Sequence, residues 1–267
     1  MTIRDWILSV YTTDNPTING AWGTAHILVL ISCTVLCVGL AFLRKTPYKV
    51  RRSVNITLAS LILFFELARR IINLYKMQYV EFETTAAFND HLVYILVPRP
   101  WCAISCWLTI ASPIINKKPL YNVASMCALI CAIIFFSYPE AGFTNKIFLF
   151  ENVYSIATHS LLLISGVSAI TLGFCDFRYK RGGSIKNSAL IELFILLSVY
   201  VYAFAEIILG IEADPLYFMP GSGVAKVLGV QYEIFLPAYI IFIILYFNLF
   251  YLFTLPKACK MKKLNAK

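Results

Sequence analysis

Charged residues are scarce in this chain. Only 14% of its 267 residues are Asp, Glu, Lys or Arg, whereas 60% are hydrophobic, and the mean hydropathy is +0.74. A soluble domain carries about 25% charged and about 45–50% apolar residues. The composition therefore excludes a soluble globular enzyme, a disordered chain and a small disulfide scaffold. It predicts an all-α multipass membrane protein.

Several motifs of soluble and metal-dependent chemistry are also missing. The three histidines form no HxxxH, and the eight cysteines form no CxxC. A zinc hydrolase, a zinc knuckle and a dithiol redox centre are therefore unsupported, and we expect neither a metal nor another cofactor. The first 20 residues lack a basic segment followed by an apolar one, so no cleavable signal peptide is expected. The net charge of +9 comes from basic residues in short loops beside apolar runs, where they orient a protein in the membrane. We therefore do not expect nucleic acid as a partner.

Long apolar runs dominate what is present. A bilayer core of roughly 30 Å needs about 20 apolar residues per helical span. Seven runs approach that length, at 24–43, 54–75, 92–115, 119–138, 152–175, 188–211 and 231–256. They predict a seven-helix transmembrane domain over residues 24–256. An extracytoplasmic segment, 1–23, precedes this domain, and a basic cytoplasmic tail, 257–267, follows it.

The distribution of basic residues predicts the orientation. Sixteen lysines and arginines lie in four alternate segments, namely 44–52, 116–118, 176–187 and 257–267. Only four, Arg4, Lys76, Lys146 and Lys226, lie in the segments on the other side. Lys and Arg are enriched in cytoplasmic loops. We therefore expect the N-terminus outside, the C-terminus in the cytoplasm and the protein in the plasma membrane.

Polar residues within the spans are the candidates for function, because ionisable groups are expensive in lipid. At 1.5 Å per residue, His26, Glu66, Cys102 and His159 all fall in the outer half of their spans. We expect these four to line one cavity that opens toward the outer leaflet. Glu66 and Arg70 are four residues apart and can form an ion pair on one helix face. Such a pair can serve the site, or it can have only the structural role of making the two buried charges tolerable.

The third apolar run is interrupted by the sequence VPRPWC, with Pro98 and Pro100 on either side of Arg99. Proline removes a backbone donor and breaks the helix, which places Cys102 near a new helix start. A helix N-terminus and a nearby cation such as Arg99 favour the thiolate. Cys102 with His159 as base would form a catalytic Cys–His pair. The alternatives are a kink that merely packs and a histidine that merely fills space.

The segment GIEADPLYFMPGSG follows the sixth run and contains Asp214 and Tyr217. Turn residues lie at both of its ends, and aromatic residues lie between them. It is either a lid that dips into the outer leaflet or a plain loop. We count Asp214 and Tyr217 as supporting residues, together with His26, Glu66, Arg70 and Arg99.

Five stretches resemble a known family. They are WGTAHILVL, LFFELARRI, LVPRPWCAI, ATHSLLLIS and ADPLYFMPG, spread over about residues 22–256. They are similar to the YwaF-type integral membrane proteins, whose animal relative is transmembrane protein 164, a phospholipid acyltransferase. The family often has a histidine two residues before the cysteine, where this chain has Pro100. The resemblance implies acyl transfer between membrane lipids, with Cys102 as nucleophile, His159 as base and a phospholipid or lysophospholipid as partner.

Three classes of function stay open at this point. The first is a thiol-dependent lipid acyltransferase that uses Cys102 and His159. The second is a small-molecule transporter or substrate-binding membrane protein without catalysis, because a broken helix beside buried charge also marks transporters. The third is a structural or partner-binding membrane protein. We therefore lean toward an enzyme without excluding the other two.

Overall fold

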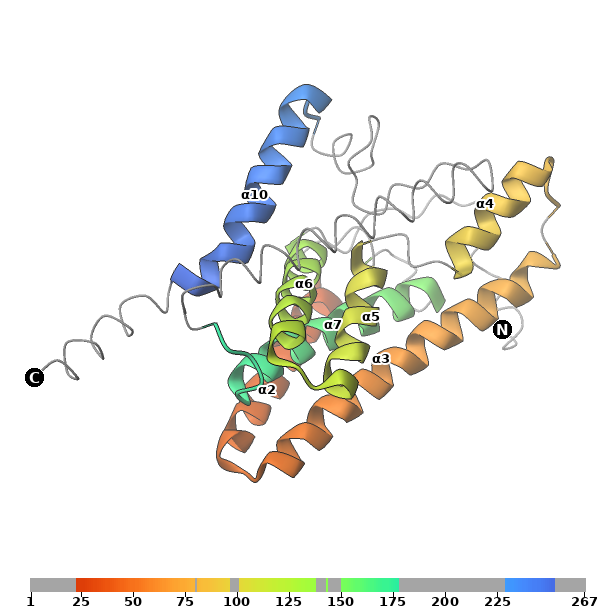
Figure 1. Cartoon of the computed structure of the whole chain (residues 1–267). Helices are drawn as coiled ribbons and strands as arrows, with labels where there is room; N and C mark the ends of the chain where they lie inside the picture. The colour runs from red at the N-terminus through yellow and green to blue at the C-terminus, as the bar shows by residue number, and fades with distance from the viewer. Residues whose placement is uncertain are drawn as a thin grey trace, which may run out of the picture. The chain divides into compact units, whose positions relative to one another are not determined.

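The computed structural model describes residues 23–79, 81–96, 101–137, 143, 150–177 and 229–252 (Figure 1). These residues form helices and their connections, with no β-strand among them, which confirms the prediction of an all-α chain. The chain divides into two compact units, Met1–Cys175 and Asp176–Lys267. The first unit contains six described α-helices and one short 3₁₀ helix, and the second contains one described α-helix.

The helices of the first unit follow the apolar runs of the sequence closely. Their bounds are α2 Thr24–Ala41, η2 Phe42–Lys45, α3 Tyr48–Met77, α4 Thr85–Leu96, α5 Trp101–Ile115, α6 Lys118–Ser137 and α7 Phe150–Thr171. The third apolar run is divided between α4 and α5, and residues 97–100 between them lie outside the described part. The sixth run, 188–211, also lies outside it.

Three of these helices are long and apolar enough to cross a membrane, judged by length and composition over the described residues. They are Thr24–Lys45, Lys118–Ser137 and Phe150–Thr171. Helix α3 is longer, with 30 residues, but its middle carries Glu66, Arg69 and Arg70. Helix α5 is apolar but has only 15 residues. The chain therefore contains at least three candidate membrane spans.

The core of the first unit is built by α3, α5, α6 and α7. Helix α6 packs against α5 and α7, and α3 packs against the same two helices (Figure 1). Gly166 of α7 permits close contact with α6, because a Cβ there would lie 2.9 Å from Leu129 Cγ. Helix α2 packs against α7 but exposes most of its apolar side chains, such as Leu28 and Val35. That exposure suits a helix surrounded by lipid.

Basic residues at the start of α3 stabilise the ends of two other helices. Arg51 donates from Nη1 to the Leu172 carbonyl at the end of α7, at 2.5 Å. Arg52 donates to the Pro113 carbonyl in α5, at 3.5 Å. Cations near helix C-termini bind carbonyls that have no partner within the helix. The chain leaves α7 through Gly173, whose φ of +82° is a left-handed conformation that glycine adopts easily.

The second unit is described only around α10, Tyr232–Leu252. This helix corresponds to the seventh apolar run and contains Pro237. Its large apolar side chains, including Ile234, Ile241 and Leu245, are exposed. Such a helix needs an apolar environment along most of its surface.

Candidate functional site

A cavity of about 220 Å³ lies in the first unit, between α3, α5 and α7. Its walls combine two thiols, an imidazole, a guanidinium group and several hydroxyl groups. The lining residues are Arg69, Cys102, Ala103, Cys106, Glu151, Asn152, Tyr154, Ser155, Thr158 and His159. Cys102 and His159, which were singled out separately in the sequence, therefore face the same space from two different helices.

Cys102 is the second residue of α5 and is half-buried. Its thiol lies within hydrogen-bonding reach of the backbone N–H groups of Cys102 and Ala103. Residues 97–100 lie outside the described part, so the helix start expected just before Cys102 stays a prediction.

His159 is held in one orientation by two contacts. Its Nδ1 lies 2.8 Å from the Ser155 carbonyl, one turn earlier in α7. A carbonyl only accepts hydrogen bonds, so Nδ1 carries the proton and the lone pair of the neutral ring is on Nε2. The ring stacks on Phe135 of α6, with centroids 4.0 Å apart and planes 9° apart. His159 therefore has a fixed tautomer with Nε2 as its basic nitrogen.

Glu66 lies behind this cavity and does not line it. Its carboxylate is fully buried and forms an ion pair with Arg70, as the spacing of the two residues predicts. It also accepts a hydrogen bond from the Tyr154 hydroxyl at 2.5 Å. A buried carboxylate needs such partners to offset its desolvation. Glu66 and Arg70 thus hold Tyr154, which does line the cavity, in place.

Arg69 is the cation that lines the cavity. Its guanidinium group lies 5.3 Å from the centre of the Tyr154 ring, while that of Arg70 lies 5.3 Å from the Trp107 ring. The sequence analysis assigned Arg69 no role at the site. The sequence did contain an indication of this difference. Adjacent residues of a helix point about 100° apart, so Arg69 cannot lie on the helix face where Arg70 pairs with Glu66.

One end of the cavity is marked by Glu151 and Asn152 in the first turn of α7. Lys76, near the end of α3, is buried and lies 3.4 Å from the Glu151 carboxylate. From Glu151 to His159 the helix rises by about 12 Å. The cavity therefore extends along α7 from Glu151 to His159.

His26 lies apart from this cavity. Its ring is fully buried, 4.7 Å from the Phe143 ring and 6.1 Å from the Phe136 ring. The expectation that four polar residues of similar depth share one cavity thus holds for Cys102 and His159 alone. Depth along a helix does not determine which neighbour a side chain faces.

Three of the residues predicted to support the site, Arg99, Asp214 and Tyr217, lie outside the described residues. Within the described part, no group of three or more His, Cys, Asp or Glu side chains is arranged to hold a metal ion. The cavity offers two thiols, an imidazole and a guanidinium group, with the Glu151 carboxylate among its lining residues.

Comparisons with known proteins give no relative for this chain: no family model, no curated protein and no solved structure matches it.

Proposed function

We propose that this chain is a membrane-embedded lipid acyltransferase that works through the Cys102 thiol. The observation that carries the proposal is the placement of Cys102 and His159 on one cavity, with the basic nitrogen of His159 fixed. A nucleophilic thiol requires a base and a group that orients the base. Here the Ser155 carbonyl is the orienting group. The sequence resemblance to the YwaF-type family supports the same reaction.

The first half of the proposed reaction transfers an acyl group to the enzyme. Nε2 of His159 accepts the Cys102 proton, and the sulfur attacks the ester carbonyl of a phospholipid. The backbone N–H groups of Cys102 and Ala103 stabilise the oxyanion that forms, and the positive charge of Arg69 favours it. The ester C–O bond breaks, His159 returns the proton to the departing alcohol, and a thioester on Cys102 remains.

The second half releases the acyl group to an acceptor. A lysophospholipid hydroxyl enters the cavity and gives its proton to Nε2 of His159. Its oxygen attacks the thioester carbonyl, the C–S bond breaks, and the proton passes to the sulfur. The product is a new phospholipid, and the free thiol is restored.

The lipid profiles of cells with and without the protein test this proposal. We expect a change in phospholipid acyl chains that disappears in Cys102→Ala. Cys106→Ala is the matched control, because Cys106 is a buried thiol that lines the same cavity one turn further along α5. A lipid change that persists in Cys102→Ala at equal protein level contradicts the thiol mechanism.

We further propose that the chain crosses the plasma membrane seven times, with its N-terminus outside. The three long apolar helices, the apolar α10 and the distribution of basic residues support this topology. Accessibility labelling of cysteines engineered into 76–91 and 176–187 tests it. The two segments are expected to react from opposite sides, and labelling of both from the same side contradicts the topology.

A second candidate function is the binding or transport of a charged solute. It is favoured by the buried group of Glu66, Arg69 and Arg70, since intramembrane charges often mark substrate pathways. Solute uptake that survives Cys102→Ala but is lost in Arg69→Gln supports the transporter. Loss of a lipid change in Cys102→Ala supports the enzyme.

A further inference from the structure

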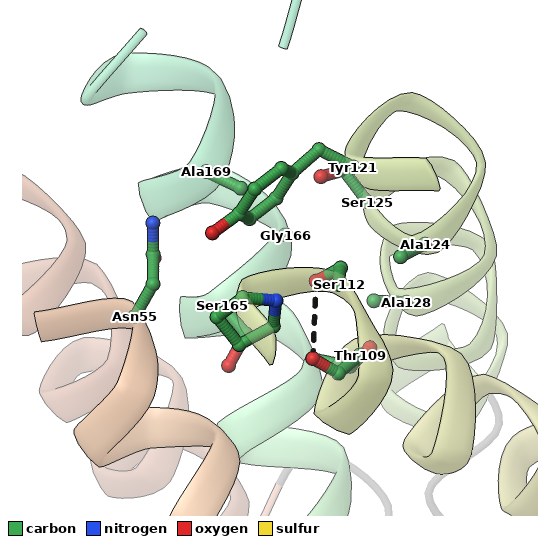
Figure 2. Close-up of a pocket in the computed structure, with 11 residues that line it drawn as sticks. Asn55, Thr109, Ser112, Tyr121, Ala124, Ser125, Ala128, Ser165, Gly166 and Ala169 are labelled. Carbon is green, nitrogen blue, oxygen red and sulfur yellow. Dashed lines mark hydrogen bonds between the residues drawn. The ribbon is translucent and has the colours of Figure 1, made fainter. Parts of the chain in front are cut away.

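A second, much smaller cavity lies where α3, α5, α6 and α7 meet (Figure 2). Its volume is about 10 Å³, and its walls carry hydroxyl and amide groups but no carboxylate, thiol or basic side chain. It adjoins none of the residues of the proposed catalytic pair. Nothing in the proposed reaction uses it.

Three polar atoms from three different helices face this cavity, and none makes a hydrogen bond of full geometry in the described part of the chain, although the Tyr121 hydroxyl and the Asn55 side chain are near neighbours. They are Nδ2 of Asn55 in α3, the hydroxyl of Tyr121 in α6 and Oγ of Ser165 in α7. Their residues are only 6%, 2% and 6% exposed. Figure 2 shows the Tyr121 ring extending across the cavity from α6 toward Asn55.

The other polar side chains around the cavity do have partners. Ser112 donates to the Thr109 carbonyl at 3.1 Å, Thr109 donates to the Ser105 carbonyl at 2.7 Å, and Ser125 lies 3.2 Å from the Cys175 sulfur. Asn55 is satisfied on its oxygen side by Ser168, at 3.2 Å. Because buried polar groups almost always have a partner, three atoms that converge on one space point to an occupant.

We propose that this cavity binds one water molecule, held by Asn55, Tyr121 and Ser165. A volume of about 10 Å³ is close to the lower limit for a single water, and a buried water typically makes about three hydrogen bonds. The water accepts from Asn55 Nδ2 and from the Tyr121 hydroxyl, and it donates to Ser165 Oγ. It thereby joins α3, α6 and α7 through one hydrogen-bonded centre.

The chemistry of the walls favours water over an ion. A cation needs several oxygen ligands, yet the Asn55 amide presents N–H to the space and no carboxylate balances the charge. An anion such as chloride is larger than water and exceeds the space available. Water, with two donors and two acceptors, matches a site of mixed donors and acceptors.

The direction of the change in thermal stability tests the proposal in the purified full-length protein. With a bridging water, Tyr121→Phe and Ser165→Ala each remove a hydrogen bond and lower Tm by about 2–4 °C. Without it, Ser165→Ala removes an unpaired buried hydroxyl and Tm rises, whereas Tyr121→Phe loses only the weak contact of its hydroxyl with Asn55. Ser125→Ala calibrates the expected drop, because Ser125 lines the same cavity but already has the Cys175 sulfur as partner.

Two further measurements make the test independent of any single substitution. One uses the double variant, and the other replaces the ions of the buffer. We expect Tyr121→Phe with Ser165→Ala to lower Tm by less than the two single drops combined, because both act through one water. Additive drops contradict a shared water. A Tm that changes when choline replaces Na⁺, or gluconate replaces Cl⁻, at constant ionic strength overturns the proposal in favour of a bound ion.

Discussion

The larger and the smaller cavity described above share the walls of α3, α5 and α7 but differ in size and chemistry. The larger one, about 220 Å³, brings together a thiol, an imidazole and a guanidinium group. The smaller one, about 10 Å³, presents only neutral polar groups at Asn55, Tyr121 and Ser165. The same three helices thus provide a space large enough for part of a lipid and another that fits a single solvent molecule.

The difference shows that neutral and ionisable polar groups have different roles in this apolar bundle. Near the smaller cavity, neutral hydroxyl and amide groups hold helices together at modest desolvation cost. Near the larger cavity, Glu66 and Arg70 neutralise one another, and Arg69 faces the space with the thiol and the imidazole. Ionisable groups are expensive in such surroundings, so their concentration at one cavity favours a functional role there.

The largest effect is expected on thiol reactivity, where a cysteine on the larger cavity is compared with a fully buried one. Cys102 should react with a lipid-like electrophile faster than any other cysteine, because it lines the larger cavity with His159 and Arg69 and is only half-buried, whereas Cys106 on the same cavity is buried. Cys127 is fully buried in α6 and should react slowest. His159→Ala should slow the Cys102 reaction by about 10²–10⁴-fold. Site-resolved mass spectrometry of the labelled protein measures all three rates.

Cys102→Ser is the companion variant for this experiment. It should abolish turnover while the protein remains folded, since the substitution replaces sulfur by oxygen in a half-buried position. Equal labelling of Cys102 and Cys127, combined with no effect of His159→Ala, would rule out the thiolate mechanism. The cavity would then be interpreted as a solute site.

The next largest effect concerns the buried ion pair behind the larger cavity. Glu66→Ala leaves Arg70 buried without its carboxylate and removes the acceptor of the Tyr154 hydroxyl. We expect the free energy of unfolding to fall by about 3–5 kcal/mol. Denaturant titration in detergent measures it, and Glu83→Ala, at an exposed acidic residue, should change it by less than about 0.5 kcal/mol. A small effect of Glu66→Ala would show that the pair contributes little to stability.

The smallest effect is expected at Gly166, which lines the smaller cavity. A Cβ there would lie 2.9 Å from Leu129 Cγ and 3.1 Å from the Ser125 carbonyl oxygen. Gly166→Ala should therefore lower the free energy of unfolding by about 1–3 kcal/mol. Gly39→Ala in α2 is the control, since a Cβ there meets nothing within 4 Å and alanine favours a helix by up to about 1 kcal/mol. Equal shifts in the two variants would show that α6 and α7 can separate at no cost.

The sequence predicts the helices well because an apolar run of about 20 residues has few alternatives in a chain of this composition. It also identifies Cys102, because two prolines precede it within an apolar run, and His159, because an ionisable residue is rare within an apolar helix. It does not predict the isolation of His26 or the exposure of Arg69 to the cavity. Depth follows from the rise of a helix, but the neighbour that a side chain meets depends on how helices rotate and pack.

The smaller cavity is invisible in the sequence for a related reason. Asn55 and Ser168 are 113 positions apart, and each is an ordinary polar residue at the flank of an apolar run. Serine, threonine and asparagine often bond to their own helix, as Thr109 does, so their presence predicts no shared site. Only the packing of α3, α6 and α7 shows which of these groups meet across helices.

The hydrogen bond from His159 Nδ1 to the Ser155 carbonyl has a consequence for the kinetics of the proposed enzyme. With Nδ1 engaged and the ring stacked on Phe135, only Nε2 is left to release a proton to the leaving alcohol and to take one from the incoming alcohol. The two alcohols therefore occupy one position in turn and never together. A double-displacement pattern follows, in which the donor lipid reacts with the free enzyme, the acceptor lipid reacts with the acyl-enzyme, and double-reciprocal plots of initial velocity are parallel.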